Sequence, residues 1–447
     1  MSSEWRVTTV EGIAAPRSAA MATGPFGSSI SAKYFAPSGV PVIRGGNLSA
    51  DISTRLNDDG LVFVSEEKAS EFQRSVAVRG DLVFTCWGTI NQVGLVDASS
   101  RHARYIVSNK QMKLSVDPTK ADSLFLYYLF SGPAKQADIL SNGIGSSVPG
   151  FNLGQLKKHE LLLPPVREQK RIAATLGALD DRIALLRETN TTLEAIAQAL
   201  FKSWFVDFDP VRAKQQGLAP AGMDEATAAL FPDGFEESAL GQVPSNWQVQ
   251  AVGDVIECVG GATPDTKDDT YWNPAEHPWT TPKDLSGLAS PVLLRTERCI
   301  STAGLARIGS GMLPAGTLLM SSRAPIGYLA VAQMPVAINQ GYIAMSPGSR
   351  LPPLYMLFWC RQNMEGIKAR ANGSTFMEIS KKAFRPIPAV VPPRPVVDAF
   401  VAVAMPLFDR VVENELQART LATLRDTLLP RLISGRLRLS RGEAVAD

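Results

Sequence analysis

Two segments of this chain, residues 164–204 and 392–432, repeat one pattern of apolar residues. The seam positions recur at alternating steps of four and three residues in both segments. That spacing is typical of a coiled-coil seam and is narrower than the apolar face of an ordinary core helix. Each segment opens with two prolines, which favour the end of one element and the start of another. The pattern predicts two long helices that pair with each other.

Most seam positions are apolar, but each seam also contains polar residues. The first expected seam consists of Ile172, Leu176, Leu179, Ile183, Leu186, Asn190, Leu193, Ala197, Leu200 and Trp204. The second expected seam consists of Phe400, Ala404, Leu407, Val411, Asn414, Ala418, Leu421, Arg425, Leu428 and Leu432. A polar residue on a seam commonly fixes register, so Asn190→Leu is expected to stabilise the pair and change the spacing that it sets. Arg425 interrupts the second seam, and we expect that helix to be less regular or bent toward a partner.

The repeat extends upstream of the two helices. Residues 80–84 match residues 316–320, and Trp5 near the start of the chain corresponds to Trp247. The alternative, two unrelated helices that each pack on their own domain, does not account for this. We expect a globular domain over 1–163, a long helix over 164–208, a linker over 209–245, a second globular domain over 246–391, and a second helix with its tail over 392–447.

The globular regions contain short mixed elements, which indicates an α+β fold. Strands are expected at 40–43, 61–64, 81–85, 316–321 and 327–332, and a helix at 121–131. The segment 210–243 is dense in glycine and proline, which predicts a linker over the surface. If two directly repeated helices pair antiparallel, the chain acquires a pseudo-two-fold axis. One chain would then imitate a dimer with two different heads, in the way that dimers address two DNA half-sites.

The composition is that of an ordinary intracellular protein. The chain has 447 residues, a net charge of +2 and 20% charged residues, with no apolar run long enough to span a membrane. Cys86, Cys258, Cys299 and Cys360 stand apart, so neither a zinc site nor a disulfide framework is expected. The N-terminus lacks the features of a secretion signal. We therefore expect a cytoplasmic protein without a strong polyanion-binding field.

No catalytic or metal constellation is present in the sequence. The three histidines, His102, His159 and His277, are scattered, and no glycine-rich loop carries the lysine of a P-loop. The step 66–68, Glu-Glu-Lys, is the only element that resembles a nuclease, and no partner aspartate can be assigned. The sequence therefore predicts a chain that is not an enzyme, with no metal and no cofactor of its own.

The remaining polar loop residues have the chemistry of base and phosphate contacts. Arginine and lysine can pair with guanine, asparagine and glutamine with adenine, and lysine pairs before each helix with phosphates. Alternatively, each could be a solvated loop side chain. The candidate DNA-binding residues are Arg44, Asn47, Trp87, Asn109, Lys110, Gln111, Lys157, Lys158, Lys283, Arg323, Asn339, Gln340, Asn372, Lys381 and Lys382.

Several segments of the chain resemble the specificity subunits of type I restriction–modification systems. The most specific segment is residues 163–173, LPPVREQKRIA, and the resemblance continues through 200–208, LFKSWFVDF. Residues 24–28, 42–47, 232–247 and 428–435 are also similar to the family. The second helix departs from it, because it begins Pro-Arg-Pro-Val-Val-Asp without the Arg-Glu-Gln signature.

The resemblance implies two target-recognition domains separated by two long antiparallel coiled-coil helices with pseudo-two-fold symmetry. Each domain reads one half of a bipartite site in double-stranded DNA. Two methyltransferase subunits dock on such a subunit and bring S-adenosylmethionine, and restriction subunits with ATP and Mg join through them. The alternatives are a protein-interaction scaffold, or the specificity subunit of a related type II-like methyltransferase or nuclease.

Overall fold

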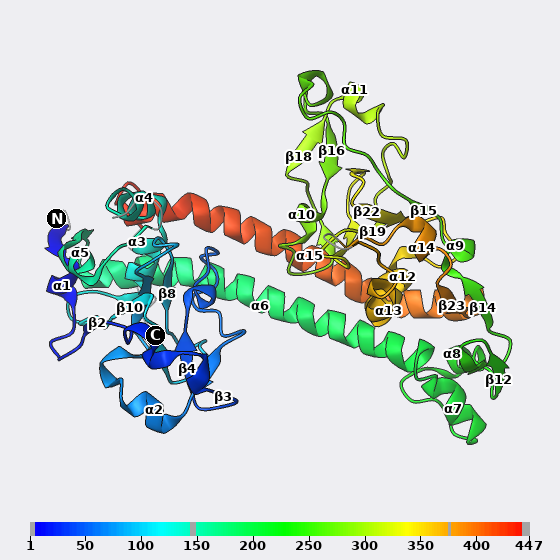
Figure 1. The fold of residues 1–447 in the computed structure, drawn as a ribbon, viewed down its shortest axis with the longest axis horizontal. Helices are drawn as coiled ribbons and strands as arrows, with labels where there is room; N and C mark the ends of the chain where they lie inside the picture. Colours follow the sequence, from blue (N-terminus) through cyan, green and yellow to red (C-terminus); the bar gives the residue numbers. More distant parts are fainter. Residues whose placement is uncertain (1–4, 144–148, 374–376, 440–447) are drawn as a thin grey trace, which may run out of the picture. The chain divides into compact units, whose positions relative to one another are not determined.

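The computed structural model describes residues 5–143, 149–373 and 377–439. The ends of the predicted first domain and of the predicted tail, 1–4 and 440–447, lie outside the described residues. The chain forms two compact units, unit 1 (Met1–Leu185 with Ala418–Asp447) and unit 2 (Leu186–Gln417). Each long helix is therefore divided between the units (Figure 1).

Two sheets form the head of unit 1. An antiparallel sheet has the order β2-β10-β7-β8, with β2 Met21–Thr23, β10 Gln111–Leu114, β7 Leu82–Thr85 and β8 Val93–Leu95. The other sheet has the order β3-β5-β4-β9-β6, with β3 Phe35–Ala36, β5 Val62–Val64, β4 Val40–Ile43, β9 Arg104–Val107 and β6 Val76–Val78. The valine and leucine content of these runs suits buried strands. The predicted strands at 40–43, 61–64 and 81–85 correspond to β4, β5 and β7.

Helices and one small sheet complete unit 1. β1 (Arg6–Thr9) pairs antiparallel with β11 (Glu160–Leu163). Helix α3 (Ser123–Ser131) is capped by Asp122, whose side chain accepts from the Phe125 amide, and it buries its aromatic residues in the core. The other helices are α1 Val10–Ile13, α2 Glu66–Ser70, α4 Pro133–Ser141 and α5 Leu153–Lys158.

Unit 2 has the corresponding sheets. One has the order β15-β22-β19-β20-β17, with β15 Cys258–Val259, β22 Tyr342–Met345, β19 Leu318–Ser321, β20 Leu329–Ala332 and β17 Val292–Leu293. Another has the order β18-β16-β21, with β18 Arg298–Ile300, β16 His277–Thr280 and β21 Ala337–Ile338. β14 (Gln248–Ala251) pairs with β23 (Pro388–Val391). The helices are α9 Val252–Val255, α10 Pro282–Leu285, α11 Thr302–Leu305, α12 Pro353–Gln362, α13 Met364–Lys368 and α14 Lys381–Phe384.

The segment expected to be a surface linker is more structured than predicted. It contains α7 (Asp209–Gln215), α8 (Glu225–Ala229) and a hairpin of β12 (Phe235–Ser238) with β13 (Gly241–Pro244). Phe208, Val211 and Phe231 from this region are buried in the main core of unit 2. Its glycines and prolines therefore separate short elements that pack on the unit.

The two heads share a common arrangement of their central strands. Each head contains one parallel strand pair whose strands correspond: β4 pairs with β9 in unit 1, and β16 pairs with β21 in unit 2. Strand β10 between β2 and β7 corresponds to β22 between β15 and β19. The amide of Val10 donates to the His159 carbonyl, and that of Val252 donates to the Ile387 carbonyl. The duplication is thus a repeat of structure as well as of sequence.

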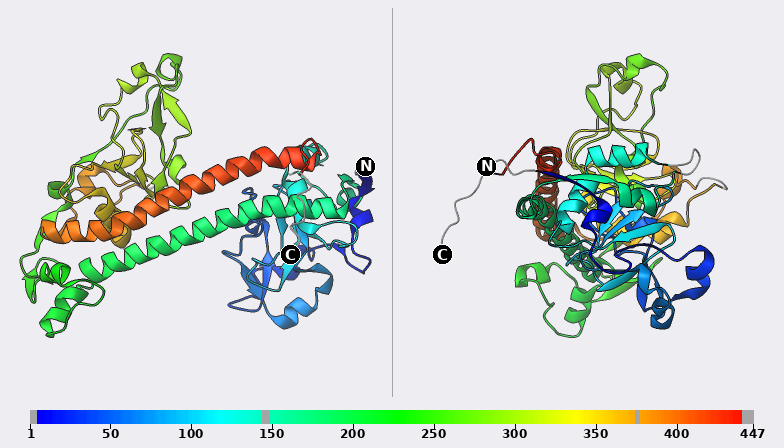
Figure 2. Two further views of the ribbon diagram at one scale, coloured as in Figure 1. Left: turned by 180° about the vertical axis from the view of Figure 1, so that it is seen from behind. Right: turned by 90° about the vertical axis from the view of Figure 1, so that its left-hand side faces the viewer.

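Each long helix is one continuous element of 40 residues, α6 (Val166–Phe205) and α15 (Arg394–Ile433), and Figure 2 shows both from two further sides. In unit 2, Asn190 contacts Asn414, whereas the rings of Phe201 and Phe400 lie 5.6 Å apart. Residue numbers therefore rise along one helix as they fall along the other, and the predicted antiparallel pairing is confirmed. No helix among the described residues is long and apolar enough to cross a membrane.

The seam positions face inward. The members that are fully buried are Ile172, Leu176, Ile183, Leu186, Asn190, Ala197, Trp204, Phe400, Ala404, Val411, Asn414, Ala418, Arg425 and Leu432. Leu179, Leu193, Leu200, Leu407, Leu421 and Leu428 are partly buried. The expected loss of regularity at Arg425 is wrong, because α15 is continuous through this residue. The Arg425 guanidinium binds Asp180 within unit 1.

Candidate nucleic-acid interface

Five of the candidate residues gather around one hollow in the head of unit 1. The hollow has a volume of about 540 Å³, and its lining includes Arg44, Trp87, Asn109, Lys110 and Gln111. The fold explains the gathering. Strands β4 and β9 are parallel neighbours, so the residues that follow each of them meet at one edge of the sheet.

Exposed aromatic and cationic groups surround this hollow. Trp87 is 50% exposed, and its ring packs on Gly150, where an added Cβ would lie 2.6 Å from a ring carbon. The Arg44 guanidinium lies 5.9 Å from the centre of the Phe35 ring and donates to the Gly60 carbonyl. Phe35 also lines the hollow, although the sequence analysis did not include it. Flat aromatic and guanidinium groups of this kind offer stacking surfaces for bases.

Two polar residues form the buried part of the lining. Gln111 is fully buried and Thr85 is 2% exposed, and both line the hollow. Ser108 donates its hydroxyl hydrogen to Gln111 Oε1, which orients the amide. The sequence signal for Thr85 is its place as the polar end of an otherwise apolar strand.

Asn47 is used inside the protein. Its Oδ1 accepts from the Arg44 amide at 2.9 Å, and its Nδ2 donates to the carbonyls of Asn57 and Asp59. The side chain is buried and closes the turn after β4. We therefore do not retain Asn47 as a DNA contact, since both ends of its amide already have partners.

Apart from its lysine pair, the candidates of unit 2 are spread over its head: Lys283 lies in α10, and the others lie between its strands and helices. Lys283 is paired with Glu297 at 2.8 Å, and Arg323 with Glu378 at 3.2 Å; both pairs are exposed. Gln340 accepts from Thr263 at 2.5 Å. Asn339 Oδ1 accepts from the Gly341 amide, and Asn372 is exposed. Exposed ion pairs cost little to open, so these side chains remain available to a ligand.

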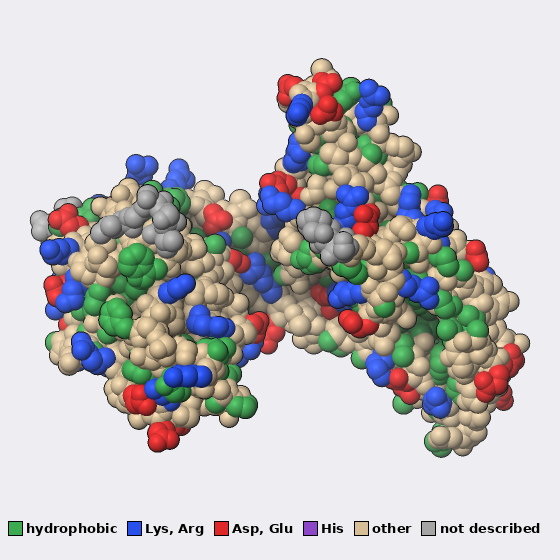
Figure 3. All heavy atoms as spheres, in the orientation of Figure 1, with side chains coloured by type: hydrophobic (Ala, Val, Ile, Leu, Met, Phe, Trp, Pro, Cys, Tyr) green, Lys and Arg blue, Asp and Glu red, His purple; other side chains and the backbone are tan. Residues whose placement is uncertain are grey.

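The lysine pairs lie on corresponding short helices. Lys157 and Lys158 end α5, and Lys381 and Lys382 begin α14. Lys157 Nζ binds Glu11 Oε1 at 2.9 Å, whereas the other three are exposed. On the face seen in Figure 3, basic and acidic side chains are interspersed, with no large field of one sign.

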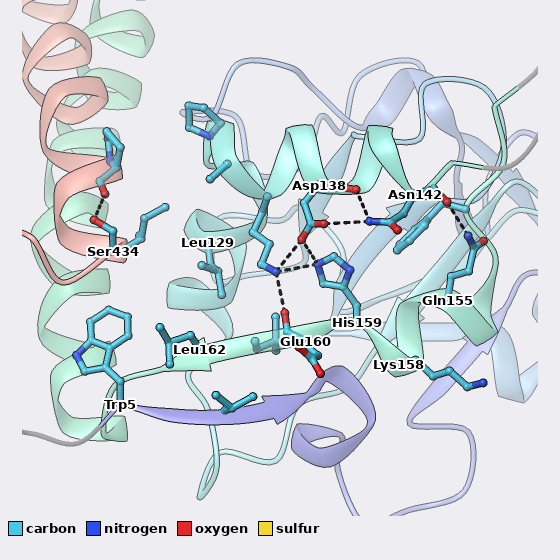
Figure 4. A pocket seen from close by; sticks show the side chains of 18 residues that line it. Trp5, Leu129, Asp138, Asn142, Gln155, Lys158, His159, Glu160, Leu162 and Ser434 are labelled. Carbon is cyan, nitrogen blue, oxygen red and sulfur yellow. Dashed lines mark hydrogen bonds and ion pairs between the residues drawn. The ribbon is translucent and has the colours of Figure 1, made fainter.

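A larger hollow of about 970 Å³ lies elsewhere in unit 1, between β1, β11, α4 and the end of α15. Figure 4 shows Trp5 and Leu162 on one side and the polar group of Asp138 and His159 on another. Lys135 Nζ lies 3.0 Å from His159 Nε2 and donates to the Glu160 carbonyl at 2.7 Å. Of the candidate DNA-binding residues, this hollow is lined by Lys158 alone, which is a candidate for a phosphate contact.

We expect the group formed by the buried His159 with Lys135 and Asp138 to make the stability of the protein depend on pH. Burial, together with the nearby Lys135 charge, lowers the pKa of His159, and Asp138 opposes this shift. An unfolded chain then binds more protons than the folded one, so stability is lost as the pH falls below about 6.5. We expect His159→Gln to flatten the dependence of the melting temperature on pH between about 7 and 5. An unchanged slope would contradict a lowered His159 pKa.

Asp180 is a structural residue that the sequence analysis missed. It is 1% exposed, accepts from Arg425 Nη1 at 2.6 Å and from the Tyr128 hydroxyl at 2.5 Å. The sequence signal that could have identified it is a carboxylate next to the first seam together with an arginine, Arg425, on the second seam. Among the residues that the structure describes, no group of three His, Cys, Asp or Glu side chains could hold a metal ion.

Comparison with known proteins places these features in a family. Residues 27–195 and 244–398 match the model of the type I restriction modification DNA specificity domain. The MjaIX type I restriction enzyme specificity subunit of Methanocaldococcus jannaschii is 35% identical over 166 residues, 37% of this chain and 38% of that protein. The HindI specificity subunit of Haemophilus influenzae is 25% identical over 376 residues, 74% of this chain and 81% of that protein.

The fold is also similar to that of a solved structure. The crystal structure of a type I restriction–modification system S subunit from M. genitalium matches with a TM-score of 0.55 at 16% identity, over 96% of each chain. At this identity the likeness concerns the fold. The two family matches run from the two heads into α6 and into the start of α15.

Proposed function

Because the chain belongs to the family of type I restriction modification DNA specificity domains, we propose that it recognises the DNA sequence for a type I restriction–modification complex. The observation that carries the proposal is the double match of the family model, which covers each of the two heads once. A chain with two copies of a DNA specificity domain is suited to reading two separate stretches of DNA. The chain itself would be non-catalytic and would act in the cytoplasm, where its DNA lies.

In this proposal each head reads one half of a bipartite site. The heads share their central strands but differ in the residues that follow them: strand register aligns Arg44 of unit 1 with Thr281 of unit 2, and Trp87 with Arg323. Different side chains on one framework favour two different half-sites, because base edges are distinguished by their donors and acceptors. The paired helices would set the unread gap.

The chemistry would come from partner subunits. Two methyltransferase subunits would dock on this chain and supply S-adenosylmethionine, and restriction subunits would add ATP-dependent activity with Mg. The relatives support this proposal because both are specificity subunits of type I restriction enzymes.

Methylome sequencing of strains with and without this gene tests the proposal. We expect a bipartite adenine-methylation motif that disappears with the gene. Arg44→Ala should relax only one half of the motif and Arg323→Ala only the other, each weakening discrimination at one base by about 1–3 kcal/mol. One contiguous motif, or loss of both halves together at full protein stability, would contradict the proposal.

The salt dependence of binding distinguishes DNA recognition from the alternative role, a protein-interaction scaffold. Phosphate contacts release counterions, so the affinity of the assembled complex for its site should fall steeply with salt. A flat dependence would favour the scaffold.

A further inference from the structure

The hollow in the head of unit 1 is deeper and has more buried polar groups than a surface that only contacts base edges in a DNA groove needs. Its volume of about 540 Å³ lies in the range of pockets that enclose small ligands. Its lining combines the half-exposed Trp87 with the buried Thr85 and Gln111. The inference below rests on the proposed function, because it concerns the DNA that this head would read.

Two buried polar atoms at this hollow have no hydrogen-bond partner. They are Gln111 Nε2 and Thr85 Oγ1, and they face each other across the register of β7 and β10. Six such side-chain atoms occur among the described residues of the whole chain, so two of them meet at one place. Folded proteins rarely leave buried donors unsatisfied. A bound acceptor would recover the hydrogen bonds that the free protein forgoes.

The second head shows that the fold does not require this hollow. Strand register equates Gln111 with Tyr342 and Thr85 with Ser321, and there the groups are satisfied. The Tyr342 hydroxyl lies 3.0 Å from Thr280 Oγ1, and Ser321 donates to the Pro325 carbonyl at 2.8 Å.

The turn after β4 in unit 1 also leaves space open, whereas the corresponding turn after β16 in unit 2 is filled. Gly45 of unit 1 corresponds to Pro282 of unit 2. A Cβ built on Gly341 would lie 2.9 Å from the Pro282 ring, so the proline fills this space. An added Cβ on Gly45 would meet only the Gln111 amide, at 3.8 Å. The open space and its unpaired groups are therefore particular to the first head.

A base that remains in the duplex cannot use this hollow. Base edges are read when protein elements enter a DNA groove, whereas Gln111 lies at the bottom of a concavity in the protein. A base reaches such a site only after it leaves the stack. Exposed aromatic side chains and a guanidinium at the rim are the groups that stack on an unstacked base.

We propose that this hollow holds one nucleobase of the first half-site, rotated out of the DNA duplex. Trp87 stacks on the base, Gln111 Nε2 donates to an acceptor on its edge, and the Thr85 hydroxyl makes a second hydrogen bond. Gln111 Oε1 is occupied by Ser108, so the amide presents a donor to the base. The second head reads its half-site without such a step.

Mismatch binding tests this inference on the wild-type chain assembled with its methyltransferase subunits. Once the methylome gives the half-site, each base pair of it is converted in turn to a mismatch by changing one strand only. Mismatching the partner of an extruded base removes the cost of unpairing, so binding should tighten about tenfold at one position. Mismatches elsewhere should weaken binding. The methylated adenine is left out, because methyltransferases extrude their own target base.

Variants assign the effect to the hollow. Gln111→Leu should abolish the tightening. Gln198→Leu should preserve it, because this partly buried glutamine of α6 also has an unpaired amide atom, Oε1, but does not line the hollow. Gln111→Glu replaces the donor by an acceptor and should shift the preferred base at that position to one with an exocyclic amine. If every mismatch weakens binding, or if the tightening survives in Gln111→Leu, the inference is overturned. The two claims fail separately. The mismatch experiment can overturn this inference while a bipartite methylation motif still supports the proposed function, and the absence of such a motif would reject the proposed function itself.

Discussion

Replacing Arg425 by leucine is expected to lower the free energy of unfolding by about 3–5 kcal/mol, because it leaves a buried carboxylate without its cation. Arg425 and Asp180 have side chains that are 6% and 1% exposed and atoms 2.6 Å apart. Burial raises the pKa of Asp180, and hydrogen bonds from Tyr128 and Arg425 oppose that rise. Without Arg425, only the hydrogen bond from Tyr128 and the nearby charge of Arg55 still oppose the rise in the pKa of Asp180.

A double variant separates the charge effect from packing. Asp180→Asn together with Arg425→Leu removes both charges and keeps an acceptor for Tyr128, so it should recover most of the lost stability. The control is Arg410→Leu on the same helix, whose partner Glu413 lies 3.0 Å away and whose pair is more than half exposed. Such a pair contributes about 0–1 kcal/mol.

Denaturant unfolding at two pH values measures this prediction. In Arg425→Leu the unpaired Asp180 is relieved by protonation, so the loss should be smaller at about pH 5 than at about pH 7. Equal losses for Arg425→Leu and Arg410→Leu would show that the buried pair does not stabilise the protein.

Replacing Asn190 by leucine is expected to cost about 1–3 kcal/mol, because it strands a buried amide. Asn414 Nδ2 donates to Asn190 Oδ1 at 2.8 Å, and Asn190 Nδ2 donates to Glu415 Oε1 at 3.0 Å. The sequence alone suggested that leucine would stabilise the helix pair. The partner on α15 reverses that expectation for the single variant.

The double variant Asn190→Leu with Asn414→Leu should restore or increase stability, since two apolar side chains then face each other. It would also remove the polar pair that opposes sliding of the helices, and the gap between methylated half-sites should become less uniform. Unfolding measurements and methylome sequencing of both variants test these two effects. A stable double variant with an unchanged gap would exclude a role for this pair in register.

Much of the architecture follows from local pattern. The heptad spacing from Ile172 to Trp204 requires a long helix with a narrow apolar face, and its recurrence from Phe400 to Leu432 requires a partner of equal kind. The strands at 40–43 and 81–85 were predictable because short β-branched and aromatic runs bounded by glycine have few other solutions. Pro406 is a strong local signal against a helix, yet α15 continues through it while its flanking seam residues stay packed.

The candidate site depended much less on local pattern. Arg44, Trp87 and Lys110 could be selected by chemistry, but only the parallel pairing of β4 with β9 brings their loops together. Nothing in the neighbourhood of Asn47 in sequence indicates that its amide turns inward, and nothing near Gln111 indicates that it is buried.

The duplicated plan and the paired helices could be predicted without coordinates, because both depend on periodicity and residue type along the chain. Tertiary structure alone decided that Arg425 meets Asp180, that Asn190 meets Asn414, and that Gln111 and Thr85 share a hollow. Each of those contacts joins residues distant in sequence, and hydrogen bonding requires atoms to approach within about 3 Å. Only the folded chain specifies such distances.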